Sequence, residues 1–239
     1  MCEMSDFEQR LEHEKLESLK ELAYGASHEI NNPLANIAAR AQTLLEDETD
    51  PARRRMLLAI HRQAMRAHEM ISDLMLFARP PKLQLATCKL PQLVERVVDE
   101  HRETAAEREI QLVSNLGGEP IELLADETQL AVAIGAVVTN AVEAVGTGGH
   151  VQVTVRRMEL AGEPWAEIVV RDDGPGISPE VRPHIFDPFF SGREAGRGLG
   201  FGLSKCWRIV TDHGGQVVVN QPAGRGAEIA ILLKVAGTK

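Results

Sequence analysis

A regular spacing of apolar residues in the second quarter of the chain constrains the fold more than any other feature. The steps between these residues alternate between three and four over three repeats, which is the heptad pattern of a helix that buries one stripe against neighbouring helices. Asp50 is a suitable N-cap and Pro51 a suitable first helical residue, so the pattern predicts a helix from Pro51 to about Ala78. The stripe consists of Leu57, Ile60, Ala64, Ala67, Ile71, Leu74 and Ala78.

A second apolar stripe lies before this helix and predicts a partner for it. Residues 4 to about 47 are expected to form one helix, followed by a turn over residues 47–51. The two helices make an antiparallel hairpin, which has too little area to bury both stripes alone. Pairing with a second copy in a four-helix bundle is the simplest remedy, so the pattern predicts a homodimer; packing onto the chain's own second domain is the alternative. The stripe consists of Ala23, Ala26, Ile30, Leu34, Ile37, Ala41 and Leu44.

Residues 26–34 (Ala-Ser-His-Glu-Ile-Asn-Asn-Pro-Leu) place a histidine on the first of these helices. If Ala23 and Ile30 are equivalent heptad positions, His28 lies away from the buried stripe, and Asn32 follows one turn later on the same face. Pro33 predicts a bend beside the histidine. A neutral imidazole has a ring nitrogen that can act as a nucleophile, whereas the alternative is an ordinary solvated histidine. A zinc-protease signature would require a second histidine at position 32, which is an asparagine.

Composition narrows the class of protein. The chain has 239 residues, enough for two compact units, and its formal net charge of −9 argues against a nucleic-acid partner. Cys2, Cys88 and Cys206 have no metal-site spacing and fit reduced thiols, which favours a cytoplasmic protein. The longest apolar run, residues 130–138, is roughly half the ~20 residues that a membrane helix needs. We therefore expect no membrane segment in this chain.

The pattern of the chain changes after Pro80 and Pro81. Strands and helices then alternate irregularly, which predicts an α+β fold with helices on one face of a mixed sheet. The expected domains are a helical hairpin over residues 1–80 and an α/β sandwich over residues 81–239. We expect strands at about 83–88, 110–114, 121–124, 151–158, 165–171, 216–220 and 227–233, and helices at about 90–107, 127–145 and 199–213.

Two glycine-rich stretches in the second domain carry candidate binding residues. Residues 172–176 (Asp-Asp-Gly-Pro-Gly) follow a predicted strand. They form either a simple turn or a binding site in which a carboxylate lies beside glycines that admit a flat ligand. Residues 198–204 (Gly-Leu-Gly-Phe-Gly-Leu-Ser) open a predicted helix, whose bare N–H groups and dipole suit a phosphate. Neither a dinucleotide fingerprint nor a P-loop is present.

Two further features are informative beside them. Asn140 lies beside the apolar stripe of the helix predicted at 127–145, where its amide oxygen is either a Mg²⁺ ligand or a local cap. Residues 185–190 hold three of the six phenylalanines and precede a glycine-rich loop with Arg193 and Arg197. This arrangement predicts a hinged lid with cations that reach phosphates, or alternatively a local aromatic cluster.

The order of these motifs resembles that of two-component sensor histidine kinases. The box around His28 on a helical hairpin is followed by the Asn140 helix, Asp-x-Gly-x-Gly from Asp172, Phe-x-Pro-Phe ending at Phe189, and Gly-x-Gly-x-Gly-Leu from Gly198. The last four are similar to the GHKL-type ATP-binding fold that histidine kinases share with gyrase, the Hsp90 chaperones and the mismatch-repair ATPases. The resemblance covers essentially the whole chain.

The resemblance implies a role for each matched residue. His28 would receive the phosphoryl group from ATP, Glu29 would be its acid/base partner, and Asn32 would position water for dephosphorylating a response-regulator receiver domain. The nucleotide site would hold adenine at Asp172, Gly174 and Gly176, Mg²⁺ at Asn140, and phosphates at Gly198, Gly200 and Gly202 beside a lid with Phe189 and Arg193.

One position departs from the family pattern. The family usually has a second asparagine four residues before Asn140, where this chain has Ala136. The change puts the autokinase rate in doubt and makes a phosphatase-dominant member possible. The alternative from another class is a GHKL-type ATPase or ATP-gated scaffold without phosphotransfer.

Overall fold

A computed structural model describes residues 29–78, 80–188, 190, 200–220 and 225–235. The chain divides into two compact units, Met1–Pro81 and Lys82–Lys239. Of the first predicted helix, residues 4–28, which include His28, lie outside the described residues.

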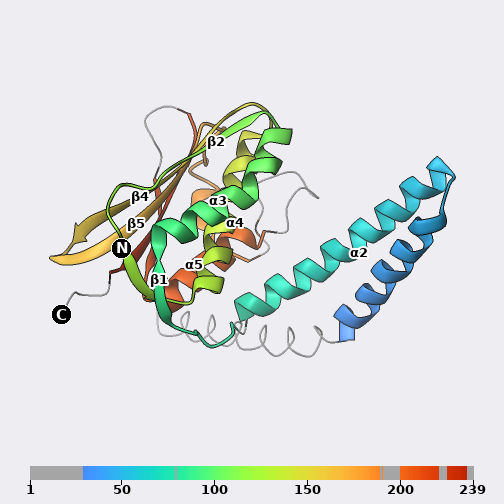
Figure 1. Cartoon of the computed structure of the whole chain (residues 1–239), viewed down its shortest axis with the longest axis horizontal. Helices are drawn as coiled ribbons and strands as arrows, with labels where there is room; N and C mark the ends of the chain where they lie inside the picture. Colours follow the sequence, from blue (N-terminus) through green and yellow to red (C-terminus); the bar gives the residue numbers. More distant parts are fainter. Residues whose placement is uncertain (1–28, 79, 189, 191–199, 221–224, 236–239) are drawn as a thin grey trace. The chain divides into compact units, whose positions relative to one another are not determined.

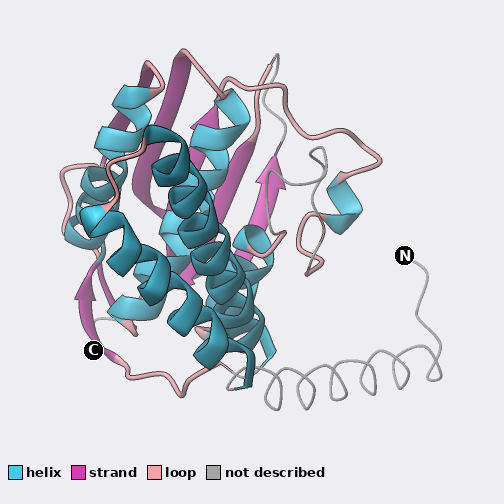
Figure 2. Ribbon diagram, turned by 90° about the vertical axis from the view of Figure 1, so that its right-hand side faces the viewer, coloured by secondary structure: helices cyan, strands magenta, loops and turns pink. Residues whose placement is uncertain are grey.

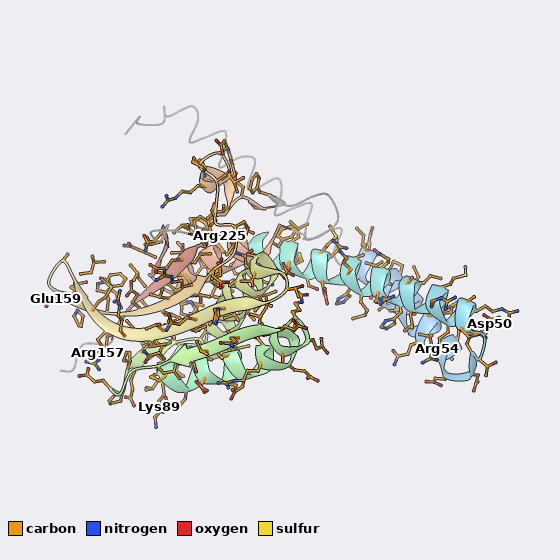
Figure 3. All side chains as sticks on the ribbon, turned by 90° about the horizontal axis from the view of Figure 1, so that it is seen from above. Asp50, Arg54, Lys89, Arg157, Glu159 and Arg225 are labelled. Atoms are coloured by element: carbon orange, nitrogen blue, oxygen red, sulfur yellow. The ribbon has the colours of Figure 1, made fainter. Side chains whose placement is uncertain are left out.

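The first unit is an antiparallel helical hairpin. One helix covers residues 29–47 without a break at Pro33, and α2 covers Pro51–Ala78 (Figure 1, Figure 2). The Asp50 side chain caps α2 as predicted, because its Oδ1 accepts the backbone N–H groups of Ala52 at 2.7 Å and Arg53 at 3.0 Å. Arg54 then donates across the turn to the carbonyl oxygen of Leu45 at 3.0 Å, and Figure 3 shows Asp50 and Arg54 together at this end of the hairpin.

Small residues form the contact between the two helices of one hairpin. Ala38, Ala41 and Ala64 are buried. The larger apolar side chains stay exposed, with Ile37 at 45% and Ile60 at 47%. A single hairpin therefore leaves much of both apolar stripes uncovered.

The second unit is built on a five-stranded mixed sheet with the order β2-β4-β5-β7-β6. Only the β2–β4 pair is parallel among the four pairs of this sheet. The strands are β2 (Ile110–Asn115), β4 (Gly149–Leu160), β5 (Glu163–Asp172), β6 (Gln216–Asn220) and β7 (Glu228–Lys234). A separate two-stranded sheet pairs β1 (Ala86–Lys89) with β3 (Glu122–Ala125), and a short 3-10 helix covers Arg182–His184.

Three helices cover one face of the large sheet, which confirms the predicted α+β arrangement (Figure 1). They are α3 (Leu90–Glu107), α4 (Glu127–Val145) and α5 (Gly202–Asp212). The central helix α4 packs against both other helices and against β4 and β5. Within the described part of the chain it is also the one helix long and apolar enough to cross a membrane; in this unit its apolar side chains line the core.

Several element boundaries differ from the sequence predictions, and three of these differences are informative. β1 begins at Ala86 rather than Leu83, because the backbone N–H of Gln84 binds the Asp126 carboxylate at 2.9 Å. α5 begins at Gly202 rather than at residue 199, because Gly200 has a φ of +70° that no α-helix contains. The turn between β4 and β5 has only two residues, Ala161 and Gly162, both with positive φ.

Candidate functional site

Asp172 is the last residue of β5, and its side chain is buried at 6% exposure. Its Oδ1 accepts hydrogen bonds from the backbone N–H groups of Gly174 at 3.0 Å and Ala227 at 3.3 Å. Its backbone N–H in turn donates to the carbonyl oxygen of Ala227 at 3.0 Å. The carboxylate is therefore fixed between the loop after β5 and the start of β7, and both of its described hydrogen bonds end on Oδ1.

The pKa values of the two neighbouring aspartates are displaced in opposite directions. Burial raises the pKa of Asp172, and the charge of Asp173 adds to this, although two backbone hydrogen bonds oppose it. The backbone N–H of His150 lowers the pKa of Asp173 by donating to its Oδ1 at 3.0 Å. The His150 imidazole lies 3.3 Å from the other oxygen. Asp172 is thus the desolvated carboxylate of the pair, whereas the exposed Asp173 is paired with His150.

Two glycines allow the close packing around Asp172. A Cβ on Gly174 would lie 2.9 Å from Asp172 Oδ1 and 3.1 Å from the backbone of Ala144 in the last turn of α4. Gly226 has a φ of +100°, and a Cβ there would lie 1.9 Å from the carbonyl oxygen of Asp172. Gly174 therefore brings α4 against the aspartate, and Gly226 lets β7 approach it. Sequence reasoning missed Gly226, although the Gly-Arg-Gly before the last strand is a signal for it.

The helix α4 presents the predicted Asn140. Its apolar stripe is buried, and Asn140 is half-buried beside the stripe as predicted. One turn earlier, the carbonyl oxygen of Ala136 lies 3.9 Å from the position that a Cβ on Gly202 would take. The start of α5 therefore faces the turn of α4 just before Asn140.

The start of α5 is held by a buried aromatic residue. Phe201 is 1% exposed, and its carbonyl oxygen accepts the Ser204 hydroxyl at 3.1 Å and the Lys205 backbone N–H at 2.9 Å. Gly202 is the first helical residue, so the positive dipole end of α5 lies there. Gly200 and Gly202 are both described, whereas Gly198 lies outside the described residues, as do Phe189 and Arg193.

The segment that precedes residues 191–199 is anchored to the sheet. The Arg182 guanidinium donates to the carbonyl oxygen of Val219 in the edge strand β6. His184 Nδ1 lies 2.8 Å from Asp187 Oδ2, and its ring centre is 5.5 Å from that of Phe190. Ile185 is buried, so the aromatic segment has a local apolar anchor.

The predicted site residues fall into two groups. Asn140, Asp172, Gly174, Gly176, Gly200 and Gly202 belong to the second unit, where Gly176 has a φ of +81°. Glu29 and Asn32 are exposed on the helix of the first unit. The described residues contain no group of three or more His, Cys, Asp or Glu side chains arranged to hold a metal ion.

Two family models match the chain. The His Kinase A (phospho-acceptor) domain matches residues 18–82, and the histidine kinase-, DNA gyrase B-, and HSP90-like ATPase matches residues 125–237. The first range contains His28, and the second contains Asn140, Asp172 and the glycine-rich stretches.

Curated sensor kinases are similar over most of this chain. The sensor histidine kinase ZraS of Klebsiella oxytoca is 32% identical over 225 residues, 94% of this chain and 48% of the relative. The signal transduction histidine-protein kinase AtoS of Escherichia coli is 29% identical over 222 residues, 93% of this chain and 36% of the relative. The chain thus spans half or less of the length of these two relatives.

Solved histidine kinases share the fold. The full-length ShkA structure in complex with AMPPNP has a TM-score of 0.78 at 26% identity, and the match covers 91% of this chain and 47% of that one. The complex of the histidine kinase ThkA with the response regulator protein TrrA has a TM-score of 0.68 at 22% identity, covering 98% and 68%, which shows the fold alone. With the phospho-acceptor domain and the ATPase domain following one another along its length, the chain belongs to the family of two-component sensor histidine kinases.

Proposed function

We propose that the chain phosphorylates itself on His28 with ATP and passes the phosphoryl group to an aspartate of a response-regulator receiver domain. One observation carries this proposal: the His-Glu-x-x-Asn-Pro box lies within the match to the phospho-acceptor domain, and the ATPase match follows in the same chain. Phosphoryl transfer depends mainly on positioning and charge neutralisation, so an acceptor on a rigid hairpin and a separate nucleotide unit suit it.

The adenine base would bind at Asp172. Because Oδ1 already accepts two backbone N–H groups, Oδ2 is the oxygen proposed to accept the adenine amine. Gly174 and Gly176 would line the base, with α4 close behind Gly174. The complex of ShkA with AMPPNP supports nucleotide binding in a chain of this fold.

The phosphates would lie at the start of α5. Gly198, Gly200 and Gly202 are the proposed lining, since backbone N–H groups at a helix start bind anions. Arg193 is the proposed lid cation for the γ-phosphate, and Phe189 belongs to the aromatic anchor of that lid.

The residues present fit a nucleotide-bound Mg²⁺ rather than a closed protein metal site. Asn140 offers one neutral amide oxygen, and no metal-binding cluster exists among the described residues. Mg²⁺ keeps several waters and takes phosphate oxygens, so Asn140 would be its protein ligand. When bound, the ion supplies neutralisation of phosphate charge. Ala136 removes the second amide one turn away, which we expect to slow autophosphorylation.

The proposed reaction joins a ring nitrogen of His28 to the γ-phosphorus while the bond from phosphorus to the leaving oxygen of ADP breaks. Glu29 would take the proton from the other ring nitrogen. Asn32 would orient water against the phosphoaspartate of a docked regulator. Its exposed position on the helix suits contact with a large partner.

The chain would act as a homodimer through the hairpin. Ile37 and Ile60 are exposed and help to line an apolar groove between the two helices. A second copy would cover this groove in a four-helix bundle. The groove is lined by Leu34, Ile37, Ala59, Ile60, Gln63 and Ala64. Sedimentation equilibrium should give twice the mass of one chain, and a mass of 26.2 kDa at micromolar concentration would contradict the dimer.

We also propose that this chemistry takes place in the cytoplasm. The support is that Cys88 and Cys206 are buried free thiols and that the nucleotide site calls for ATP.

The test of the function is the chemistry of the bound label. Incubation with γ-labelled ATP should leave label on the protein that is lost in acid and kept in alkali, as expected of a phosphohistidine. ATP hydrolysis without any protein-bound label would favour an ATP-gated scaffold instead.

A further inference from the structure

A cluster of hydrogen bonds ties the first residues of the second unit to the start of α4. We call it the entry junction, and it consists of Gln84, Asp126, Gln129 and His213. The backbone N–H of Gln84 donates to Asp126 Oδ2 at 2.9 Å, although the two residues are 42 positions apart. Gln84 lies between the end of α2 at Ala78 and the start of β1 at Ala86, two residues after the second unit begins at Lys82.

Asp126 uses its two carboxylate oxygens for different purposes. Oδ1 accepts the backbone N–H of Gln129 at 3.0 Å and so caps the amino end of α4. Oδ2 accepts Gln84, together with the Gln129 side-chain amide at 3.2 Å. The residue is 7% exposed. Burial opposes its ionisation, yet the hydrogen bonds from Gln84 and Gln129 outweigh burial and lower its pKa.

His213 holds the backbone of the same residue from the end of α5. Its Nδ1 lies 2.8 Å from the carbonyl oxygen of Ile209 and must carry the proton, because a carbonyl oxygen only accepts. Its Nε2 is then free to accept the backbone N–H of Asp126 at 3.0 Å. The helix pair α4–α5 thus fixes Asp126, and Asp126 fixes the entering chain.

The entry junction is remote from the nucleotide site. α4 runs from Asp126 to the turn at Ala144 that packs against Gly174. That distance is about 27 Å at 1.5 Å per helical residue. A change at Gln84 therefore leaves the residues proposed to bind ATP in place.

We propose that Asp126 is a positioning residue for the phosphoryl transfer. The segment from Ala78 to Gln84 is the tether to the phospho-acceptor hairpin, and Asp126 fixes where this tether begins by binding the Gln84 N–H. This inference rests on the proposed function. Without the tie, the first fixed point moves from Gln84 to β1 at Ala86, which frees two more residues and adds up to about 7 Å of reach. A longer tether lowers the effective concentration of one site at the other, by the −3/2 power of length or more steeply.

Substitutions at Gln84 test the tie without touching the cap. Gln84→Pro removes the N–H, while the matched control Gln84→Ala keeps it and shortens only an exposed side chain. At saturating ATP, the first-order rate of label incorporation into Gln84→Pro should fall by about 1.5-fold or more, with unchanged affinity for ATP, because the tether after Ala78 lengthens from six residues to eight. Gln84→Ala should behave as wild type.

Asp126→Asn breaks the same tie from the other side. Asparagine caps a helix as well as aspartate does, so α4 keeps its cap, but the amide NH₂ replaces the acceptor that faces Gln84. Asp126→Asn should show the same fall in rate, and the double variant with Gln84→Pro should show no further fall. The Gln84 amide should exchange with solvent slowly in wild type and faster in Asp126→Asn.

The results distinguish failure of this inference from a purely structural role of the junction and from failure of the proposed function. Wild-type rates in Gln84→Pro and Asp126→Asn, additive losses in the double variant, or fast exchange of the wild-type Gln84 amide would overturn the inference. A loss of ATP affinity equal to the loss of rate would show that the junction only supports the fold. Absence of label on wild type would instead refute the proposed function, while amide exchange would still report on the tie.

Discussion

At the end of β5, the carboxylates of Asp172 and Asp173 accept hydrogen bonds from opposite sides of that strand. Asp172 accepts the N–H of Ala227, next to β7, whereas Asp173 accepts the N–H of His150 in β4. One aspartate is buried with a raised pKa, and the other is exposed with a lowered pKa. Two adjacent residues of one type thus contribute to stability with opposite signs, and this difference can be measured.

Asp172→Asn should weaken ATP binding. The variant can still accept the two backbone N–H groups through its amide oxygen, but it presents an NH₂ group where the adenine amine requires an acceptor. The lost charge-assisted hydrogen bond is worth about 1.5–3 kcal/mol, roughly tenfold to a hundredfold in Kd. Titration calorimetry measures this directly, and a wild-type Kd would mean that residues 172–176 are only a turn.

The same variant should not lose stability at neutral pH. The folded-state pKa of Asp172 is raised, so the folded chain binds more protons than the unfolded chain between the two pKa values, and stability falls as the pH rises through that window. Asp172→Asn removes this cost, so it should be at least as stable as wild type at pH 7, and the difference should shrink as the pH falls.

Asp173→Asn is the matched control for that pH dependence. Because the folded-state pKa of Asp173 is lowered, its carboxylate stabilises the fold above the unfolded pKa, and this contribution is lost as the pH falls through the folded value. Asp173→Asn should therefore be less stable than wild type at pH 7, with a gap that closes in acid. Urea titrations from pH 3 to pH 7 that give the two variants gaps of the same sign would contradict this explanation.

Gly226→Ala should destabilise the second unit and weaken ATP binding together. A Cβ at this position would meet the Asp172 carbonyl oxygen at 1.9 Å, so β7 must move away from the residue that is proposed to bind adenine. Gly162→Ala is the control, because Gly162 also has a positive φ but no atom within 4 Å of its Cβ position. Backbone strain alone costs on the order of 1–3 kcal/mol, and thermal unfolding should show a larger loss for Gly226→Ala. Equal losses would mean that the close approach is relieved by small shifts.

Asn32→Ala should separate two activities on one helix face. Asn32 belongs to the first unit, whereas the described residues that are proposed to bind nucleotide belong to the second, so autophosphorylation should be retained. The regulator's phosphate should persist longer, because positioning roles of this kind are typically worth about 10²–10⁴-fold. The measurement is the decay of pre-phosphorylated regulator in the presence of the wild-type or the variant chain at matched ADP. Equal decay rates would mean that Asn32 does not orient the water.

Much of the fold could be predicted from the sequence because periodicity and caps are local. Pro51–Ala78, Leu90–Glu107 and Glu127–Val145 are helices with the predicted bounds, since each has an apolar stripe and a clear end signal. The predicted strands at 151–158 and 165–171 left Pro164 in the connection between them, whereas the structure includes it in β5. It lies inside β5 opposite Glu159, one residue before the β5–β7 pairing begins at Trp165.

The parts that could not be predicted depend on contacts between distant residues. Gln84 was expected in a strand, but its backbone N–H binds the Asp126 carboxylate instead. Gly226 is important only because β7 pairs with β5 beside Asp172. The exposure of Ile37 and Ile60 likewise could not be predicted, because a heptad stripe does not show which of its residues contact the other helix of one hairpin. Motif order indicated which residues to propose for the site, and the fold supplied the hydrogen bonds that hold Asp172.

The proposed phospho-acceptor is tested by label incorporation from γ-labelled ATP into His28→Ala, beside His61→Ala as a control on α2. We expect that His28→Ala takes up no label yet binds ATP with nearly wild-type affinity, because every described residue that is proposed to bind nucleotide lies in the other unit. His61→Ala should label as wild type does. Undiminished label on His28→Ala would show that His28 is not the acceptor and would direct the search to His61 or His68.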